Sequence, residues 1–239
     1  MALDAALWRA AQRLAREVDE LSFEAPVTHV YNPLRYAAPA YREYLRRYAT
    51  SPKRIVYLGM NPGPWGMAQT GVPFGQVAAV RDWLGVSGKL GRPQVEHPRY
   101  QVSGFGCHRS EVSGARLWST LAERYATPDD FFRDRFVANY CPLLFIAHDR
   151  NLVPEKLPPA ERTPLLAACD RHLQAICRAL EPEWVIGIGK FARERAEKAL
   201  AGTDIAVLEI LHPSPASPAA NRGWAGQVDA QLARHGLTL

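Results

Sequence analysis

The sequence lacks any long apolar run, and this absence excludes a membrane-spanning protein. No stretch of its 239 residues approaches the ~20 consecutive apolar residues that a transmembrane helix needs. The N-terminal stretch from Met1 to Leu21 is amphipathic and has no apolar signal-peptide core. We therefore expect a protein of the cytoplasm, including the bacterial nucleoid, or of the nucleus, without a membrane partner.

Cysteine is scarce as well, and no Cys-x-x-Cys pair occurs. The four cysteines are scattered, which excludes a disulfide scaffold and gives no zinc or iron–sulfur signature. Cys169, His172 and Cys177 share one predicted helix, but Cys169 falls on its apolar stripe and is expected to pack as a small hydrophobe. We assign no metal and no cofactor.

Lysine is the third residue in short supply. Only 5 of the 29 basic residues are lysine, so the other 24 are arginine, and the formal net charge is +5. The planar guanidinium of arginine binds phosphate with two parallel hydrogen bonds, which suits a polyanionic partner. A composition rich in Ala, Arg and Pro also follows from GC-rich coding, and the composition alone leaves both interpretations open.

The apolar pattern predicts an α/β fold. With 47% hydrophobic and 22% charged residues, the chain can bury a substantial core, which excludes general disorder. Short apolar runs typical of buried strands lie at Arg54–Leu58, Phe136–Tyr140, Trp184–Ile188 and Ala206–Leu211. Helical patterns alternate with them at Leu3–Leu21, Pro39–Ala49, Gln76–Leu84, Ser113–Tyr125, Pro164–Leu180, Lys190–Leu200 and Gly223–His235. We predict a single domain over residues 1–239, a three-layer α/β/α structure with a central, mostly parallel four-stranded sheet.

Two stretches outside these elements are interpreted as loops. The polar, glycine-rich segment Gly85–Cys107 is long for a connection between a strand and a helix, and loops of that length are usually functional or mobile. The proline-rich stretch Val153–Pro164 is expected to be a surface connection within the same domain.

One glycine motif has the spacing typical of a nucleotide-binding motif. Gly187, Gly189 and Ala192 follow a predicted strand with the G-x-G-x-x-A spacing of a dinucleotide fingerprint. The acidic residue at the expected distance, Glu209, lies inside the next strand and not at its end, where a ribose would bind. A tight turn from strand to helix accounts for the glycines at least as well.

Polar side chains follow three of the predicted strands where a ligand is expected. Ligands of open parallel sheets bind at the carboxyl ends of the strands, and these ends carry Asn61, Asn139 and His212. The loop after the first strand also contains Phe74. Any one of them would be unremarkable, since an Asn between prolines and glycines is usually a turn former. Together they offer amide hydrogen bonds, an imidazole and a flat ring, which suit a planar heterocycle such as a pyrimidine.

Four long motifs then carry a family resemblance. They are Gly59-Met-Asn-Pro-Gly-Pro-Trp-Gly-Met67 with its continuation to Gly75, Cys107-His-Arg-Ser-Glu-Val-Ser-Gly-Ala-Arg-Leu-Trp118, Val137-Ala-Asn-Tyr-Cys-Pro-Leu-Leu-Phe145 and His212-Pro-Ser-Pro215. The sequence closely resembles the single-strand-selective monofunctional uracil-DNA glycosylases from about residue 20 to its end. The resemblance implies hydrolysis of the N-glycosidic bond of uracil in DNA, and we also consider C5-oxidised uracils as substrates.

The resemblance implies a role for each site residue. Asn61 and His212 would be catalytic, with Asn61 positioning a water molecule and His212 donating a hydrogen bond to uracil O2. Phe74 would stack on the base and Asn139 would pair with its edge. Gly63 and Met67 would shape the pocket near C5, where the methyl group of thymine must be excluded. The substrate-binding residues are therefore Met60, Gly63, Met67, Phe74 and Asn139.

The motifs contain no lysine, so a Schiff-base nucleophile is not expected and the enzyme should be monofunctional. For DNA contact, the resemblance points to the start of a helix and to a wedge loop. These DNA-binding residues are Arg109, Ser110, Pro213, Ser214, Pro215, Ala216 and Ser217. Ala216 stands where relatives commonly carry arginine. The expected partners are single- and double-stranded DNA containing uracil, bound by a monomer.

Two alternatives remain at this point. A glycosylase of the same superfamily could act on deaminated purines such as hypoxanthine or xanthine, because pocket dimensions decide the base. A non-enzymatic nucleotide-binding domain could instead use the glycine motif from Gly187 to Ala192. The set of Asn61, Phe74, Asn139 and His212 favours an enzyme over a binding domain.

Overall fold

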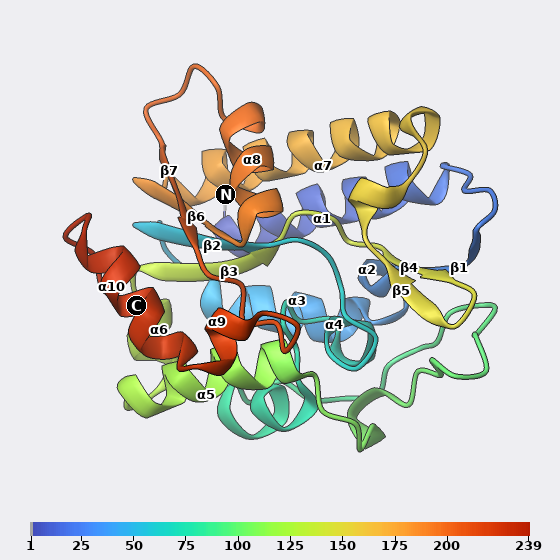
Figure 1. The fold of residues 1–239 in the computed structure, drawn as a ribbon, viewed down its shortest axis with the longest axis horizontal. Coiled ribbons are helices and arrows are strands. Elements are labelled where there is room, and N and C mark those ends of the chain that lie inside the picture. Colours follow the sequence, from blue (N-terminus) through green and yellow to red (C-terminus); the bar gives the residue numbers. More distant parts are fainter. Residues whose placement is uncertain (1) are drawn as a thin grey trace.

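The computed structural model describes residues 2–239, and its centre is a parallel four-stranded sheet. The strands are β2 (Ile55–Gly59), β3 (Arg135–Asn139), β6 (Trp184–Ile188) and β7 (Ala206–Ile210), in the order β3-β2-β6-β7 (Figure 1). All three neighbouring pairs are parallel. The four predicted strands and the predicted fold class are confirmed. Because the strands are parallel, their carboxyl ends meet at one edge of the sheet.

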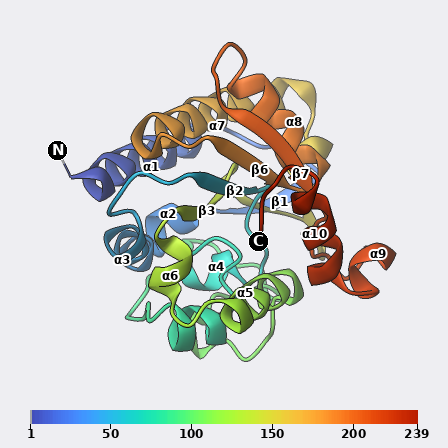
Figure 2. The same cartoon turned by 90° about the vertical axis from the view of Figure 1, so that its left-hand side faces the viewer.

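Helices cover both faces of this sheet and complete the three layers. The first helix, α1 (Leu3–Asp19), lies with α7 (Pro159–Leu180) and α8 (Lys190–Ala199) over one face (Figure 2). The opposite face is covered by α3 (Ala38–Tyr48), α5 (Val112–Arg124) and α6 (Pro128–Phe132). The remaining α-helices are α2 (Pro33–Tyr36), α4 (Met67–Thr70), α9 (Pro218–Asn221) and α10 (Trp224–Ala233).

A second sheet, which the sequence pattern did not predict, lies beside the first. Three antiparallel strands form it in the order β1-β4-β5: β1 (Val27–Tyr31), β4 (Leu144–Ala147) and β5 (Arg150–Leu152). The strands are three to five residues long, and β5 is polar and largely exposed. The apolar residues of β4 follow those of β3 after only four residues, and the polar, exposed β5 has no apolar pattern of its own. The sheet nevertheless matters for the site, because β5 brings Asn151 to the cavity described below.

One predicted helix boundary is wrong. The long helix α7 begins at Pro159, five residues before the predicted start at Pro164, so the proline-rich stretch is partly helical. Proline is favourable in the first turn of a helix, and Pro159 begins this one. The predicted helix Gln76–Leu84 is present over residues 77–83, and its later part, Ala79–Trp83, is π-helical. The segment Gly85–Cys107 is a loop with one 3₁₀ turn at Gly104–Gly106.

The glycine motif at the end of β6 has a packing role. A Cβ atom at Gly187 would lie 2.3 Å from the backbone nitrogen of Arg193, so only glycine lets α8 pack this closely on the sheet. Gly189 has a φ of +90°, which favours glycine. Glu209 lies within β7 and pairs with the Arg193 guanidinium at 2.9 Å, so its carboxylate serves the packing of α8.

The apolar core lies on both sides of the central sheet. Every residue of β2 is buried, as expected of a strand with helices on both faces. On the side of α3 and α6, Tyr48 stacks on Phe132 at a centroid distance of 4.0 Å, and the hydroxyl of Tyr44 donates to the carbonyl of Val137 at 2.9 Å. These contacts fix β3 and with it the position of Asn139. Across residues 2–239, no helix combines the length and the apolar character that a membrane crossing requires.

Candidate active site

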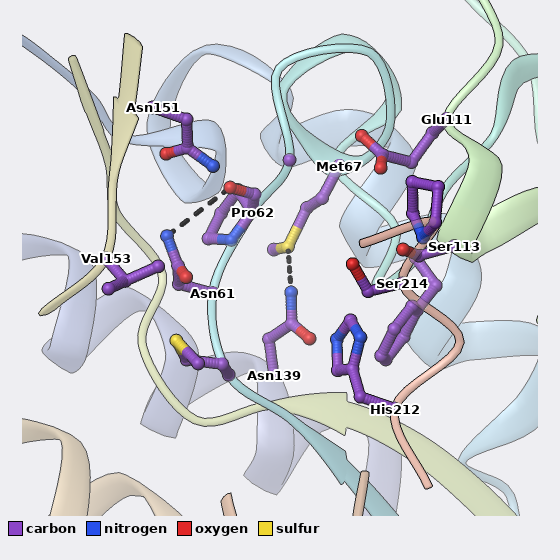
Figure 3. A pocket seen from close by; sticks show the side chains of 14 residues that line it. Asn61, Pro62, Met67, Glu111, Ser113, Asn139, Asn151, Val153, His212 and Ser214 are labelled. Atoms are coloured by element: carbon purple, nitrogen blue, oxygen red, sulfur yellow. Dashed lines mark hydrogen bonds between the residues drawn. The ribbon is translucent and has the colours of Figure 1, made fainter. Parts of the chain in front are cut away.

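A cavity of about 400 Å³ opens at the carboxyl edge of the parallel sheet. The structure brings all seven predicted catalytic and substrate-binding residues to its wall: Met60, Asn61, Gly63, Met67, Phe74, Asn139 and His212 (Figure 3). Two wedge-loop residues, Ser214 and Pro215, also line it. Within residues 2–239, no group of three or more His, Cys, Asp or Glu side chains is placed to hold a metal ion.

Hydrogen bonds from the side-chain nitrogen of Asn61 fix the orientation of its amide group. Asn61 follows β2, and its Nδ2 donates to the carbonyl of Leu143 at 3.2 Å and to that of Pro62 at 3.4 Å. Both hydrogen bonds fix the orientation of the amide and leave Oδ1 as an acceptor. A side chain with one fixed donor and one open acceptor can orient a water molecule, although an amide cannot take up its proton as a strong base.

His212 is a neutral imidazole at physiological pH. It follows β7, and burial lowers its pKa from 6.5 to about 4. A neutral imidazole keeps one N–H donor, which is sufficient for a hydrogen bond to a developing oxyanion. Its close neighbour is Gly189, where a Cβ atom would lie 3.2 Å from that of His212. The glycine motif therefore also makes room for the imidazole.

Phe74 is fixed in an unusual backbone conformation. Its φ of 53° lies in the left-handed region, which non-glycine residues rarely adopt. The carbonyl of Phe74 accepts hydrogen bonds from Trp118 Nε1 at 3.1 Å and from the backbone N–H of Gln76 at 2.7 Å. A Cβ atom at Gly114 would lie 2.0 Å from the same carbonyl. These contacts hold the ring in the cavity, with its centroid 6.2 Å from that of His212.

Asn139 lines the cavity beside Met67. Its Nδ2 donates to Met67 Sδ at 3.2 Å, and Figure 3 shows the two side chains facing each other. The paired residue on β2 is Gly59, where a Cβ atom would lie 2.3 Å from Asn139 Oδ1 and 2.5 Å from Phe74 Cε2. Glycine at this strand end is thus required for the amide and the ring to occupy their positions.

The predicted DNA-binding residues lie outside or at the rim of the cavity. Arg109 and Ser110 are exposed, and the Arg109 guanidinium lies 4.4 Å above the ring of Trp65. The other five predicted residues, Pro213 to Ser217, belong to the predicted wedge loop Pro213–Gly223, and Pro215 and Ala216 are exposed.

Internal hydrogen bonds give the wedge loop a fixed shape. Arg116 donates to the carbonyl of Pro213 at 3.2 Å and to Asn221 Oδ1 at 3.1 Å. Asn221 Nδ2 in turn donates to the carbonyl of Pro215 at 2.8 Å, and Ser214 Oγ accepts from the Ala216 amide at 3.1 Å. The loop is therefore organised before any partner binds.

Five further residues line the cavity and were not predicted: Pro62, Glu111, Ser113, Asn151 and Val153. Glu111 and Ser113 belong to the motif Cys107–Trp118, but no role was predicted for either residue. Asn151 lies in β5, and Val153 follows that strand. No periodic pattern in the sequence predicted β5.

Comparison with known proteins agrees with this site. The model of the uracil DNA glycosylase superfamily matches residues 46–228, which identifies the class of protein. Two curated relatives, from Rattus norvegicus and Mus musculus, are 48% identical over 94% of this chain and 82% of theirs. A third, from Bos taurus, is 46% identical over 94% of this chain and 84% of its own. All three are described as single-strand selective monofunctional uracil-DNA glycosylases.

This chain belongs to the family of single-strand selective monofunctional uracil-DNA glycosylases. A solved structure described as Pedobacter heparinus SMUG2 has the same fold. It superposes with a TM-score of 0.66 over 95% of this chain and 97% of that chain, at 15% sequence identity.

The contact at Gly59 generates a first prediction. Gly59→Ala places a methyl group where Asn139 and Phe74 now lie, so we expect the rate of base excision to fall by about 10²-fold or more, as for other misplaced reacting groups. Gly226→Ala is the matched control, because nothing lies within 4 Å of a Cβ atom there and the excision rate should not change. Single-turnover excision and thermal unfolding of both variants provide the measurement. Wild-type excision by a folded Gly59→Ala protein would contradict the packing argument.

The burial of His212 generates a second prediction. Because its pKa is about 4 in the folded protein and near 6.5 in an unfolded chain, the neutral form should persist down to about pH 5. The same difference contributes stability above pH 6.5 that is lost as the pH falls towards 4, since the unfolded chain then binds the proton first. Following the His212 ring signals by NMR between pH 4 and pH 8 tests this. A midpoint near 6.5 in the folded protein would refute it.

Proposed function

We propose that this chain removes uracil from DNA by hydrolysis of the N-glycosidic bond and so initiates base excision repair. The observation that carries this proposal is the placement of Asn61, Phe74, Asn139 and His212 around one cavity. An extruded nucleotide could enter this cavity with its base between the ring of Phe74 and the opposite wall. Family membership supports the same reaction.

The geometry supports a division of roles along the edge of the base. His212 donates to uracil O2, and Asn139 pairs with N3 and O4 in place of its contact with Met67. Around the pyrimidine ring, the position after C4 is C5, so C5 faces Met67 and Gly63. Going round the cavity, His212 is followed by Asn139 and then by Met67 (Figure 3). The order of side chains thus matches the order of ring atoms.

The proposed reaction is a displacement of the base by water. The bond between C1′ and N1 breaks with its electron pair going to the base. A water molecule that donates a hydrogen bond to Asn61 Oδ1 supplies the oxygen that forms the new bond to C1′. The proton released by the water passes to solvent. The uracil anion is stabilised by the hydrogen bond from neutral His212 at O2. No lysine is among the cavity-lining residues, which fits a monofunctional enzyme without a Schiff-base step.

We propose that DNA binds across the mouth of the cavity as a single strand or a duplex, with the protein acting as a monomer. Arg109 and Ser110 precede α5, whose N-terminal amides can bind a phosphate. The wedge loop would occupy the space that the extruded nucleotide leaves. The relatives are named for single-strand selectivity, and we extend that preference to this chain.

The proposed chemistry is tested by removing one group at a time. Asn61→Ala and His212→Ala should each lower the single-turnover excision rate by about 10²-fold, the scale of losing one preorganised hydrogen bond in a transition state. DNA affinity and thermal unfolding should change little.

The substrates for this test are oligonucleotides that contain uracil, hypoxanthine or xanthine, cut at the abasic site with alkali. Rates within a few-fold of wild type for both variants would refute the assigned roles. Faster release of a purine than of uracil would favour the deaminated-purine alternative.

The size of Ala216 generates a prediction about the wedge. Extruding a base from a duplex costs a few kcal/mol of unstacking, and a methyl group fills little of the space left behind. We expect uracil to be excised faster from single strands and U·G pairs than from U·A pairs. Ala216→Arg should reduce this difference in excision rate.

The matched control for the wedge is Ala201→Arg, which adds the same charge at an exposed position between α8 and β7. Arginine attracts DNA phosphates whatever their sequence, so both variants are compared at one salt concentration. Position 216 has no wedge role if Ala201→Arg reduces the difference in excision rate between U·A pairs and single strands as much as Ala216→Arg does. The same conclusion follows if the wild type excises uracil from U·A pairs as fast as from single strands.

A further inference from the structure

Gln69 is a fully buried polar side chain in α4 that no step of the proposed reaction uses. Its amide makes four hydrogen bonds. Nε2 donates to the carbonyl of Pro64 at 2.9 Å and to that of Gln101 at 3.0 Å. Oε1 accepts from the backbone N–H groups of Ser103 at 2.9 Å and Gly104 at 3.2 Å. A side-chain amide has two N–H donors and an oxygen with two lone pairs, so this amide uses its full hydrogen-bonding capacity.

The loop from Asn61 to Gly66 has few backbone donors of its own. Pro62 and Pro64 have no backbone N–H. The hydrogen bond from the N–H of Gly66 to the carbonyl of Gly63 is long, at 3.4 Å. Side-chain amides bind the two proline carbonyls: Asn61 Nδ2 donates to that of Pro62, and the buried amide in α4 donates to that of Pro64. Since Asn61 and Gly63 line the cavity, the position of this loop decides where both residues lie.

The segment Gln101–Gly104, which makes the other hydrogen bonds of the amide, is itself anchored. The hydroxyl of Tyr31, on β1, donates to the carbonyl of Tyr100 at 3.0 Å. The hydroxyl of Tyr100 donates to the carbonyl of Asp149, between β4 and β5, at 2.7 Å. The ring of Tyr100 also packs against Trp65, with 5.5 Å between the ring centroids. The antiparallel sheet therefore holds the segment to which the amide is bonded.

We propose that Gln69 is a positioning residue that aligns Asn61 with the substrate by tying the loop Asn61–Gly66 to the segment Gln101–Gly104. The proposal rests on the proposed function, in which Asn61 orients the attacking water. Gln69 is not among the cavity-lining residues, so it acts through the backbone of the loop and not on the base. A displacement of reacting groups by about 1 Å can lower a rate by about 10²-fold.

This role predicts an effect on the rate and not on DNA binding. None of the predicted DNA-binding residues is among the four hydrogen-bond partners of Gln69. Gln69→Leu replaces the amide by an apolar side chain of similar size. The maximal single-turnover rate on single-stranded DNA containing uracil should fall by about tenfold or more. The enzyme concentration that gives half of that rate should change by less than about twofold.

Gln69→Glu gives the hydrogen bond to Pro64 a dependence on pH. The carboxylate still accepts from the two N–H groups, but it has no donor for the carbonyl of Pro64. Burial raises the pKa of a carboxyl group, so the introduced acid gains a proton, and with it a donor, as the pH falls. The ratio of its excision rate to the wild-type rate should rise by about fivefold or more from about pH 8 to about pH 5. The same ratio for Gln69→Leu should not change with pH.

Gln174→Glu is the matched control. Gln174 Nε2 donates to the carbonyl of Ala199 at 2.8 Å, and neither residue lines the cavity. The variant makes the same change from amide to acid beside a carbonyl, so its excision rate should equal that of the wild type at both pH values. Thermal unfolding of each protein at both pH values shows that the rates belong to folded protein.

Three results would overturn the positioning role. They are a wild-type maximal rate in folded Gln69→Leu, a loss that appears only as weaker DNA binding, and a rate of Gln69→Glu that stays low at about pH 5. Should Gln69→Leu fail to fold, Gln69→Glu decides the question alone, because its rates at the two pH values compare one protein with itself. A wild-type protein that releases no uracil would refute the proposed function itself, so the two failures are distinguishable.

Discussion

The site depends on how closely backbone and side chains approach one another at the carboxyl edge of the parallel sheet. In the register of β2 and β3, Gly59 lies directly beside Asn139, and the absence of a side chain on Gly59 is what admits the amide and the Phe74 ring. Gly63 admits the Glu111 carboxyl, and Gly189 admits His212 in the same way. Parallel pairing brings the strand ends together, and glycine at those ends lets polar and aromatic side chains converge on one cavity of about 400 Å³.

Much of this arrangement could be predicted from the sequence because its signals are local. Continuous apolar runs marked the four buried strands, and the polar residues that follow three of them had to meet at one edge. The second sheet was missed because β5, Arg150–Leu152, is three residues long and exposed, so it has no apolar period to detect. Asn151 was missed with it. The position of Glu111 was also beyond prediction, since a carboxyl before a helix is usually solvated, and only the fold shows that Gly63 and Gly66 enclose it.

The electrostatics of the cavity favour stabilisation by fixed dipoles over proton transfer. Burial keeps His212 neutral and raises the pKa of Glu111, so both titratable groups are shifted towards their uncharged forms. Asn61 and Asn139 carry no charge at any pH. In the proposed reaction, neutral donors that are already oriented cost little reorganisation when the base becomes an anion.

Helix α5 connects the parts of the site that the strand ends do not hold. Trp118 and Gly114 lie one turn apart on the helix, and together they fix the carbonyl of Phe74 and hence its left-handed backbone. Glu111 precedes the first turn, and Arg116 reaches the wedge loop through the carbonyl of Pro213. The Phe74 ring, the Glu111 carboxyl and the predicted wedge loop are thus all connected to one helix. A displacement of α5 would move all three relative to Asn61 and His212, which follow strands of the sheet, so in the proposed complex we expect the packing of α5 to set the alignment of the base with these two side chains.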